Sequence, residues 1–377
     1  MASIAIAGLA LAGCSDVGGG AESSSESPAT EPDAGQSSPA PLPAGELVEA
    51  APADLAIGVA VAGGGHHLDA GLGGGSALAD ATYADLVATN FTSVSPENQL
   101  KWEWVHPERD TYDFEAGDEL VEFAEAHGLE VRGHTLLWHS QNPAWLTSAD
   151  LTDDELREVL RDHIETVVGR YAGRIAQWDV ANEIFDDSAA LRDEENPFIE
   201  RFGIEIVADA FRWAHEADPE ALLFLNDYSI ESLGPKSDAY FELVQDLLAD
   251  DVPVHGMGFQ GHLSMLYPKP GGMTENFARF ADLGLQVAVT EADVRMAVDG
   301  GTASAEDLAA QGDYYVEMLD ACLAVATCQS FTVWGLSDAF SWVPYFFEGE
   351  GAALLLDDDY AVKPAYSALV ELLAAGR

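Results

Sequence analysis

The chain has 377 residues, of which 48% are hydrophobic, and this is enough for one large core. Its formal net charge is −50, and lysine occurs only at positions 101, 236, 269 and 363. A surface this acidic repels nucleic-acid phosphates and anionic lipid head groups, which argues against nucleic acid as a partner. The acidity suggests a salt-tolerant or highly soluble exported protein, unless it only reflects the general composition of its lineage.

Residues 1–14 have the outline of an export signal. The apolar run at 4–12 is too short to span a bilayer, and it ends in Leu11-Ala12-Gly13-Cys14, which resembles a bacterial lipobox. We therefore expect a secreted lipoprotein in which Cys14 carries the lipid that tethers it to the membrane at the cell surface. Residues 15–50 contain no aromatic or basic residue, and we expect them to form a flexible linker rich in Ser, Pro, Ala and Gly.

The three cysteines fit the same interpretation. If Cys14 carries lipid, Cys322 and Cys328 remain, and in an exported protein they either form a disulfide or stay as buried free thiols. No Cys-x-x-Cys motif or Asp-x-Asp-x-Asp-Gly loop is present, so we expect no metal and no cofactor. We interpret His66 and His67 as solvated loop histidines, since neighbouring histidines without a spaced carboxylate are poor evidence for a metal site.

From about residue 51 onward, apolar runs alternate with amphipathic segments. The candidate strands lie at 55–62, 91–97, 130–138, 175–183, 221–228, 255–263, 286–294 and 330–338. The predicted helices lie at 79–88, 116–127, 152–171, 203–216, 236–249, 274–283, 304–324 and 363–375. Eight strand–helix units predict an α/β fold, a (β/α)₈ TIM barrel that forms a single catalytic domain over 51–377. The alternative, an open doubly wound sheet, lacks a Gly-x-Gly-x-x-Gly turn after the first strand.

Polar and aromatic side chains gather where these strands end. Glu183 closes one apolar run and Glu291 another, so both are expected at the C-terminal mouth of the barrel, where active sites lie. A glycosidase needs one carboxyl group to protonate the leaving oxygen and a second to attack or to activate water. Aromatic faces that stack on sugar rings, together with amides, Lys and His that bind hydroxyls, favour a sugar cleft.

These segments resemble glycoside hydrolase family 10, the retaining endo-β-1,4-xylanases, over about residues 51–377. The matching pieces are Glu97-Asn98 with Lys101; Gly133-His134-Thr135 with Trp138-His139 and Gln141; Trp178-Asp179-Val180 with Asn182-Glu183; Gln260 with His262; Thr290-Glu291 with Asp293; Trp334-Gly335 with Asp338 and Trp342; and Lys363-Pro364-Ala365-Tyr366. Several ordered motifs in one chain make the resemblance specific.

The resemblance implies endo-hydrolysis of β-1,4-xylosidic bonds in xylan by double displacement, with Glu183 as the general acid/base and Glu291 as the nucleophile. His262 would donate to Glu291, Asp293 would orient His262, and Asn182 would bind the sugar 2-hydroxyl. The substrate-binding residues would be Glu97, Asn98, Lys101, His134, Trp138, Gln141, Tyr228, Gln260, Trp334 and Trp342. It also implies a disulfide between Cys322 and Cys328. We expect a monomer that acts on xylan and xylo-oligosaccharides.

Three alternatives remain open at this point. A metal-dependent barrel hydrolase would use His134, His139 and His262, although no His-x-His on the first strand supports it. A catalytically weak or inactive lipoprotein would bind oligosaccharides without cleaving them. Activity on β-1,4-glucan depends on whether the subsite walls admit the hydroxymethyl group that xylose lacks.

Overall fold

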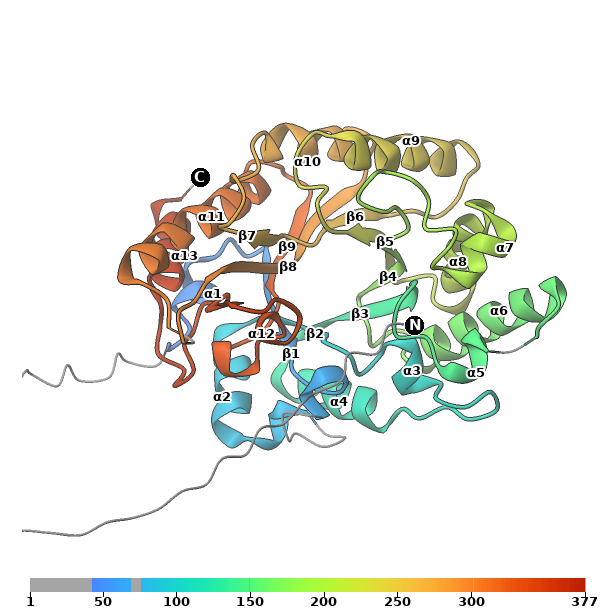
Figure 1. Ribbon diagram of the computed structural model, residues 1–377, viewed down its shortest axis with the longest axis horizontal. Coiled ribbons are helices and arrows are strands. Elements are labelled where there is room, and N and C mark those ends of the chain that lie inside the picture. Colours follow the sequence, from blue (N-terminus) through green and yellow to red (C-terminus); the bar gives the residue numbers. More distant parts are fainter. Residues whose placement is uncertain (1–42, 69–75, 149, 301, 377) are drawn as a thin grey trace, which may run out of the picture. The chain divides into compact units, whose positions relative to one another are not determined.

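The computed structural model describes residues 43–68, 76–148, 150–300 and 302–376, and its centre is a closed barrel of parallel strands (Figure 1). The barrel strands are β1 (Ala56–Val61), β2 (Ser93–Pro96), β3 (Glu130–Leu137), β4 (Gln177–Asn182), β5 (Leu222–Asp227), β6 (Gly256–Phe259), β8 (Gln286–Ala297) and β9 (Cys328–Val333). Each pairs in parallel with its neighbours, and β9 closes the ring by pairing with both β8 and β1. The predicted (β/α)₈ fold is confirmed.

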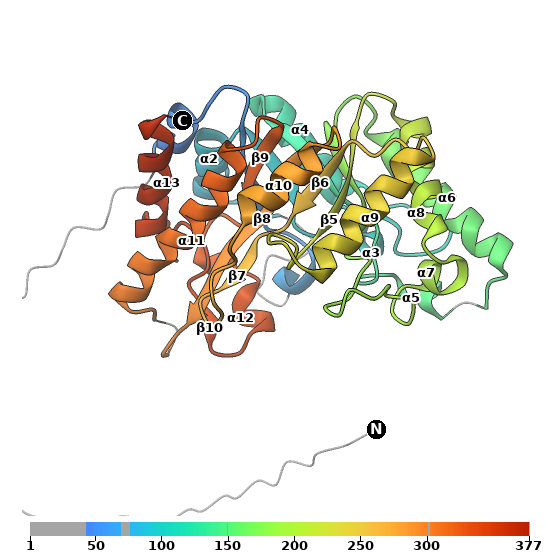
Figure 2. The ribbon, with the colours of Figure 1, turned by 90° about the horizontal axis from the view of Figure 1, so that it is seen from above.

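Helices cover the outside of the barrel (Figure 1 and Figure 2). The main ones are α2 (Ala81–Asn90), α4 (Glu115–His127), α6 (Asp153–Arg170), α8 (Glu205–Ala217), α9 (Pro235–Ala249), α10 (Met273–Ala281), α11 (Ala305–Leu323) and α13 (Pro364–Ala375). Their ends follow local chemistry. Thr152 and Glu155 form a capping box that begins α6, and α4 ends at Gly128 in the left-handed conformation.

The folded part begins earlier than predicted. Residues 46–50, assigned to the flexible linker, form the short helix α1 (Glu46–Ala50), because Leu47 is buried in the core and the Tyr366 hydroxyl donates to Glu46. The rest of the predicted linker that precedes residue 43, and Cys14 with it, lies outside the described residues. Other short elements that the sequence did not indicate are α3 (Trp102–Val105), α5 (Ala144–Thr147), α7 (Pro197–Phe202), α12 (Val343–Phe346) and β10 (Glu350–Gly351), while β7 (His262–Ser264) overlaps the end of the predicted strand 255–263.

The observed strands differ from the predicted ones in their bounds, and two of these differences lie beside Glu291 at the mouth of the barrel. The predicted strand 255–263 is divided into β6 and β7, because Gly261 between them has φ 78°, which only glycine adopts readily. The predicted strand 286–294 continues to Ala297 as β8. Beyond the barrel, β8 pairs with β7 through His262 and Asp293, so Glu291 lies inside a strand and still at the mouth.

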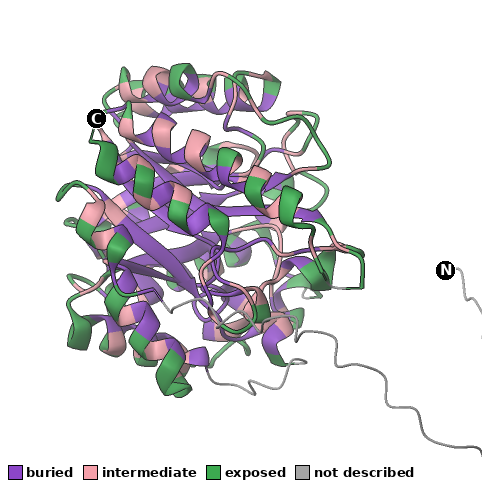
Figure 3. Ribbon diagram, turned by 90° about the vertical axis from the view of Figure 1, so that its left-hand side faces the viewer, coloured by how far each residue is buried: buried purple, intermediate pink, exposed green. Residues whose placement is uncertain are grey.

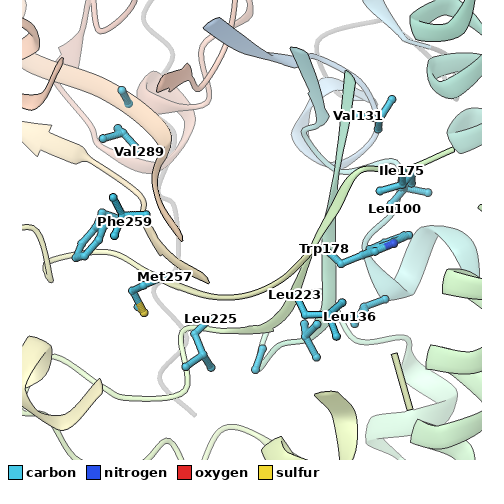
Figure 4. Close-up of a cluster of buried hydrophobic side chains, with 14 of the residues drawn as sticks. Leu100, Val131, Leu136, Ile175, Trp178, Leu223, Leu225, Met257, Phe259 and Val289 are labelled. Atoms are coloured by element: carbon cyan, nitrogen blue, oxygen red, sulfur yellow. The ribbon is translucent and has the colours of Figure 1, made fainter. Parts of the chain in front are cut away.

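The core lies between the strands and the helices. In Figure 3 the strands are buried along most of their length, whereas the helices expose one side and bury the other. Figure 4 shows part of this core, with Trp178, Ile175, Leu223 and Met257 among its side chains. Trp178 is fully buried and lies opposite Gly133 in the pairing of β3 with β4.

A disulfide joins Cys322, near the end of α11, to Cys328 at the start of β9. It confirms the pairing and excludes two free thiols. Within the described ranges, no helix is long and apolar enough to cross a membrane.

The close approach of Trp178 to Gly133 can be tested. A Cβ atom at position 133 would lie 2.3 Å from the Trp178 ring, so Gly133→Ala should lower the free energy of unfolding by about 1–3 kcal/mol, the usual cost of overpacking. Gly169→Ala is the matched control: it lies in α6 with nothing within 4 Å, and alanine should stabilise the helix by about 0.5–1 kcal/mol. Chemical denaturation would measure both, and equal stability of the two variants would contradict the packing.

Candidate active site

The C-terminal ends of the strands surround a cleft of about 970 Å³. Its size and its mixture of aromatic and polar walls suit a small organic ligand. Of the fifteen catalytic, supporting and substrate-binding residues predicted from the sequence, only Asn182 and Asp293 do not line it. The other thirteen are Glu97, Asn98, Lys101, His134, Trp138, Gln141, Glu183, Tyr228, Gln260, His262, Glu291, Trp334 and Trp342.

Glu291 lies buried at the floor of the cleft and is surrounded by donors. Asn226 Nδ2 donates to its Oε1 at 2.7 Å, His262 Nε2 lies 3.3 Å from its Oε2, and His134 Nδ1 lies 3.9 Å from its Oε1. Burial favours the neutral carboxyl, but the charge of His134 and the hydrogen bond from His262 outweigh it and lower the pKa of Glu291 to about 2. Glu291 is therefore an ionised carboxylate at neutral pH.

His262 is held between two carboxylates. Its Nδ1 lies 2.9 Å from Asp293 Oδ2, and the Trp342 indole donates to the same oxygen at 2.7 Å. Although burial disfavours the imidazolium, the charges of Asp293 and Glu291 raise the pKa of His262 to about 10. Asp293 is fully buried behind the cleft, so it reaches a ligand only through His262.

Glu183 has different surroundings. Trp138 Nε1 donates to its Oε2 at 2.9 Å and Gln260 Nε2 donates to its Oε1 at 3.0 Å, and both donors are neutral. His139 Nδ1 lies 3.7 Å away, and burial lowers the pKa of His139 despite the nearby charge of Glu183. Glu183 follows the last residue of β4 in the left-handed conformation, with φ 53°. Strained backbone of this kind is concentrated at functional sites.

Amide side chains connect the two carboxylates. Asn226 Nδ2 donates to both Glu291 and Asn182 Oδ1, and Gln260 Nε2 contacts both Glu183 and Asn182 Oδ1. The Asn182 side-chain amide lies against these two nitrogens, the Asn226 carbonyl oxygen at 3.2 Å and the Trp138 indole nitrogen at 3.1 Å, so neighbours on both sides hold it in place. Asn226 was not among the residues predicted for the site. Its position at the end of β5 was the available signal.

The next residues along the cleft form a second polar group. Lys101 Nζ lies 4.7 Å from the centre of a Trp138 ring and donates to Asn98 Oδ1, which also accepts from Gln141 Nε2. Burial lowers the pKa of Lys101, while the charges of Glu291, Glu97 and Glu183 oppose this shift.

A buried network that the sequence analysis missed supports His134. Its Nδ1 lies 3.0 Å from Asp179 Oδ2, and Arg132 pairs with both oxygens of the Asp179 carboxylate. Asp179 and Arg132 come from β4 and β3, so the barrel itself fixes the position of the imidazole. The signal was Arg132 and Asp179 inside strands that are otherwise apolar.

Three aromatic residues form walls of the cleft. The Trp334 ring lies edge-on to His134, the Trp342 ring lies edge-on to His262, and Lys236 Nζ lies 3.6 Å from the centre of the Tyr228 ring. These contacts hold the three rings in place at the cleft.

The prediction of solvated loop histidines at 66 and 67 is wrong. His67 is 1% exposed, and its Nε2 lies 2.8 Å from Glu97 Oε2. The His66 side chain is 9% exposed, lines the cleft, and places its Nε2 3.8 Å from Glu97 Oε1. A carboxylate 30 residues away in the sequence supplies the partner that the local pattern lacked. By contrast, His134, His139 and His262 do not form a ligand cluster within the described part of the chain.

Comparisons with known proteins agree with this geometry. Residues 58–372 match the model of glycosyl hydrolase family 10. Endo-1,4-beta-xylanase B of Thermotoga neapolitana is 39% identical over 291 residues, which cover 77% of this chain and 83% of the relative. Endo-1,4-beta-xylanase of Agaricus bisporus is 38% identical over 296 residues, which cover 78% of this chain and 87% of the relative.

Solved structures are similarly close. Xylanase 10B from Thermotoga maritima has a TM-score of 0.80 and 40% identity, covering 88% of this chain and 98% of that chain. Xylanase 10B from Thermotoga petrophila, solved in complex with xylobiose, has a TM-score of 0.80 and 39% identity, covering 88% and 97%. With this family match over most of its length, and two carboxylates at the mouth of a (β/α)₈ barrel, the chain belongs to glycosyl hydrolase family 10.

Proposed function

We propose that this protein is an endo-β-1,4-xylanase that hydrolyses xylan with retention of configuration at the anomeric carbon. The observation that carries the proposal is the contrast between the two carboxylates at the mouth of the barrel. Glu291 is ionised by histidines and an amide, whereas Glu183 accepts from the neutral donors Trp138 and Gln260. The names of the relatives, and the xylobiose bound to a similar structure, support xylan as the substrate.

The chemistry follows from these environments. Glu291 attacks the anomeric carbon while Glu183 donates its proton to the leaving glycosidic oxygen, which gives a covalent glycosyl-enzyme. Glu183, now ionised, takes a proton from a water molecule as that water attacks the same carbon and releases Glu291. Two displacements restore the original configuration. His262, ordered by Asp293, stabilises the Glu291 carboxylate as it departs.

The remaining cleft residues bind the sugar chain. Glu97, Asn98, Lys101 and Gln141 offer donors and acceptors to xylose hydroxyls, and Trp334, Trp342 and Tyr228 offer faces for stacking. Asn182, directly behind Glu183 and Gln260, is the proposed partner of the sugar 2-hydroxyl. All these groups come from a single chain, which supports a monomer as the active species.

Replacing the carboxylates separates their roles. Glu291→Ala should abolish release of reducing sugar from xylan, and Glu183→Ala should lower it by about 10²–10⁴-fold, the usual contribution of a general acid. With an aryl β-xylobioside whose leaving group needs no protonation, azide should restore turnover in both variants. The Glu291→Ala variant should yield the α-azide by one displacement, whereas Glu183→Ala should yield the β-azide by two.

Nuclear magnetic resonance of the products measures these outcomes, and exposed Glu205→Gln serves as the control that should keep wild-type activity. The same assay on soluble cellulose measures activity on β-1,4-glucan. Binding of xylo-oligosaccharides by the wild type without any hydrolysis would support the sugar-binding alternative and would contradict the proposal. An initial product of inverted configuration would contradict the role of Glu291 as nucleophile.

The pH dependence tests the function of His262. Activity requires ionised Glu291 and is lost as the pH falls through the pKa of this group, which is about 2 in the wild type. Because His262→Gln removes a cationic donor, the acid limb of kcat/KM should move upward by about 1–3 pH units. His127→Gln, at the end of α4, should leave the limb in place. An unchanged acid limb in His262→Gln would show that this histidine does not control the nucleophile.

We also propose that the protein is exported and held at the cell surface by a lipid on Cys14. The lipobox-like segment 11–14 and a disulfide, which persists in oxidising compartments, support this location. Mass spectrometry of the protein from a membrane fraction should find diacylglyceryl-modified Cys14 at the mature N-terminus, and Cys14→Ala should move the protein to the soluble fraction. A mature N-terminus elsewhere, without lipid, would contradict the tether.

A further inference from the structure

Two histidines at one end of the cleft are held against Glu97 by a glycine-rich turn. Gly65 begins a 3₁₀ turn (Gly65–Leu68) with φ 52°, and a Cβ atom on it would lie 2.8 Å from the Asn98 side chain. Asn98 Nδ2 in turn donates to the Gly63 carbonyl. The turn therefore approaches the residue next to Glu97 at a distance that only glycine allows.

The donor atoms of these residues converge. His67 Nε2 lies 2.8 Å from Glu97 Oε2, His66 Nε2 lies 3.8 Å from Glu97 Oε1, and a ligand atom from each of the three residues lies within 4.8 Å of the others. The His66 side chain is nine-tenths buried, and its Nε2 makes no hydrogen bond in the described structure. A buried nitrogen aimed at a carboxylate and a second imidazole, with no hydrogen bond of its own, points to a ligand that fills the space between them.

We propose that His66, His67 and Glu97 form a binding site for a divalent transition-metal ion of the zinc type. Two imidazole nitrogens and one carboxylate oxygen are donors that Zn²⁺ prefers, and water completes a tetrahedral shell. With metal–ligand bonds of about 2.0–2.2 Å, ligands of a tetrahedral ion lie roughly 3.4 Å apart. The two distances from the imidazoles to Glu97, 2.8 Å and 3.8 Å, lie on either side of this value. Small side-chain rotations suffice to reach this geometry.

The surroundings select the type of ion. Imidazole donors favour Zn²⁺, Co²⁺, Ni²⁺ and Cu²⁺ over Mg²⁺ and Ca²⁺, which prefer oxygen. The net charge of −50 raises the local concentration of cations, while the nearby Lys101 opposes binding and limits the affinity.

Occupation of this site excludes sugar from the same end of the cleft. This consequence rests on the proposed function, in which Glu97 binds a xylose hydroxyl, because a bound metal ion takes the carboxylate oxygen and the space beside it from the sugar. The metal is therefore an inhibitor that competes with xylo-oligosaccharides, and it takes no part in hydrolysis.

Cobalt absorption tests the site without any turnover. Titration of the metal-free protein with Co²⁺ should produce the visible bands of a tetrahedral ion, and Zn²⁺ should displace them. His66→Gln and Glu97→Gln should each weaken Co²⁺ binding by at least about tenfold. His127→Gln, with its histidine at the end of α4, is the matched control and should bind like the wild type. Circular dichroism should verify that each variant is folded.

The outcomes are distinct. Equal Co²⁺ affinity in the wild type and in folded His66→Gln would overturn the site. A wild-type titration that produces no tetrahedral Co²⁺ bands would overturn it as well. A second titration in saturating xylohexaose should weaken Co²⁺ binding, and unchanged affinity would overturn the competition. A protein that binds Co²⁺ at this site but neither binds nor cleaves xylo-oligosaccharides would overturn the proposed function and leave the metal site standing.

Discussion

A buried carboxylate that must stay ionised is the constraint around which the mouth of this barrel is built. Isolated from water, Glu291 would hold its proton, because burial alone favours the neutral form. His262, His134 and Asn226 reverse that preference, and each is fixed by a further partner. His262 is oriented by Asp293, and His134 is oriented by Asp179, which Arg132 neutralises. The need to keep the Glu291 carboxylate ionised therefore accounts for polar side chains on β3, β4, β5, β7 and β8.

The same arrangement explains why two glutamates in one cleft behave differently. Glu183 has a left-handed backbone and accepts from the neutral donors Trp138 and Gln260. Glu291 lies inside a continuous strand, beside the cationic His262. Neutral amides lie between the two carboxylates: Asn226 contacts Glu291, Gln260 contacts Glu183, and both contact Asn182. Such separation of two carboxyl groups by their surroundings is how one fold supplies both an acid and a nucleophile.

Three basic side chains of this strongly acidic chain line the cleft, namely Lys101, His134 and His262, and all three lie close to Glu291 or feel its charge. At the other end, His66 and His67 meet Glu97, and the His66 ring also lies beside Tyr345 and Phe346 of α12. This end of the cleft is built from the turn after β1 and from α12, both of which lie outside the barrel strands.

The sequence by itself determined the barrel and most of the residues predicted for the cleft, because strand and helix periods and strand-end positions are local properties that parallel pairing carries to one face. It left open whether Cys322 and Cys328 form a disulfide or stay as free thiols, and the structure shows the disulfide. It did not determine α1, whose burial depends on α13 far along the chain, or the break between β6 and β7. It also missed Asn226 and the partner of His67, and it placed His66 and His67 in solvent. Only the tertiary structure decided these points, because hydrogen bonds between residues 30 to 65 positions apart exist only once the barrel closes.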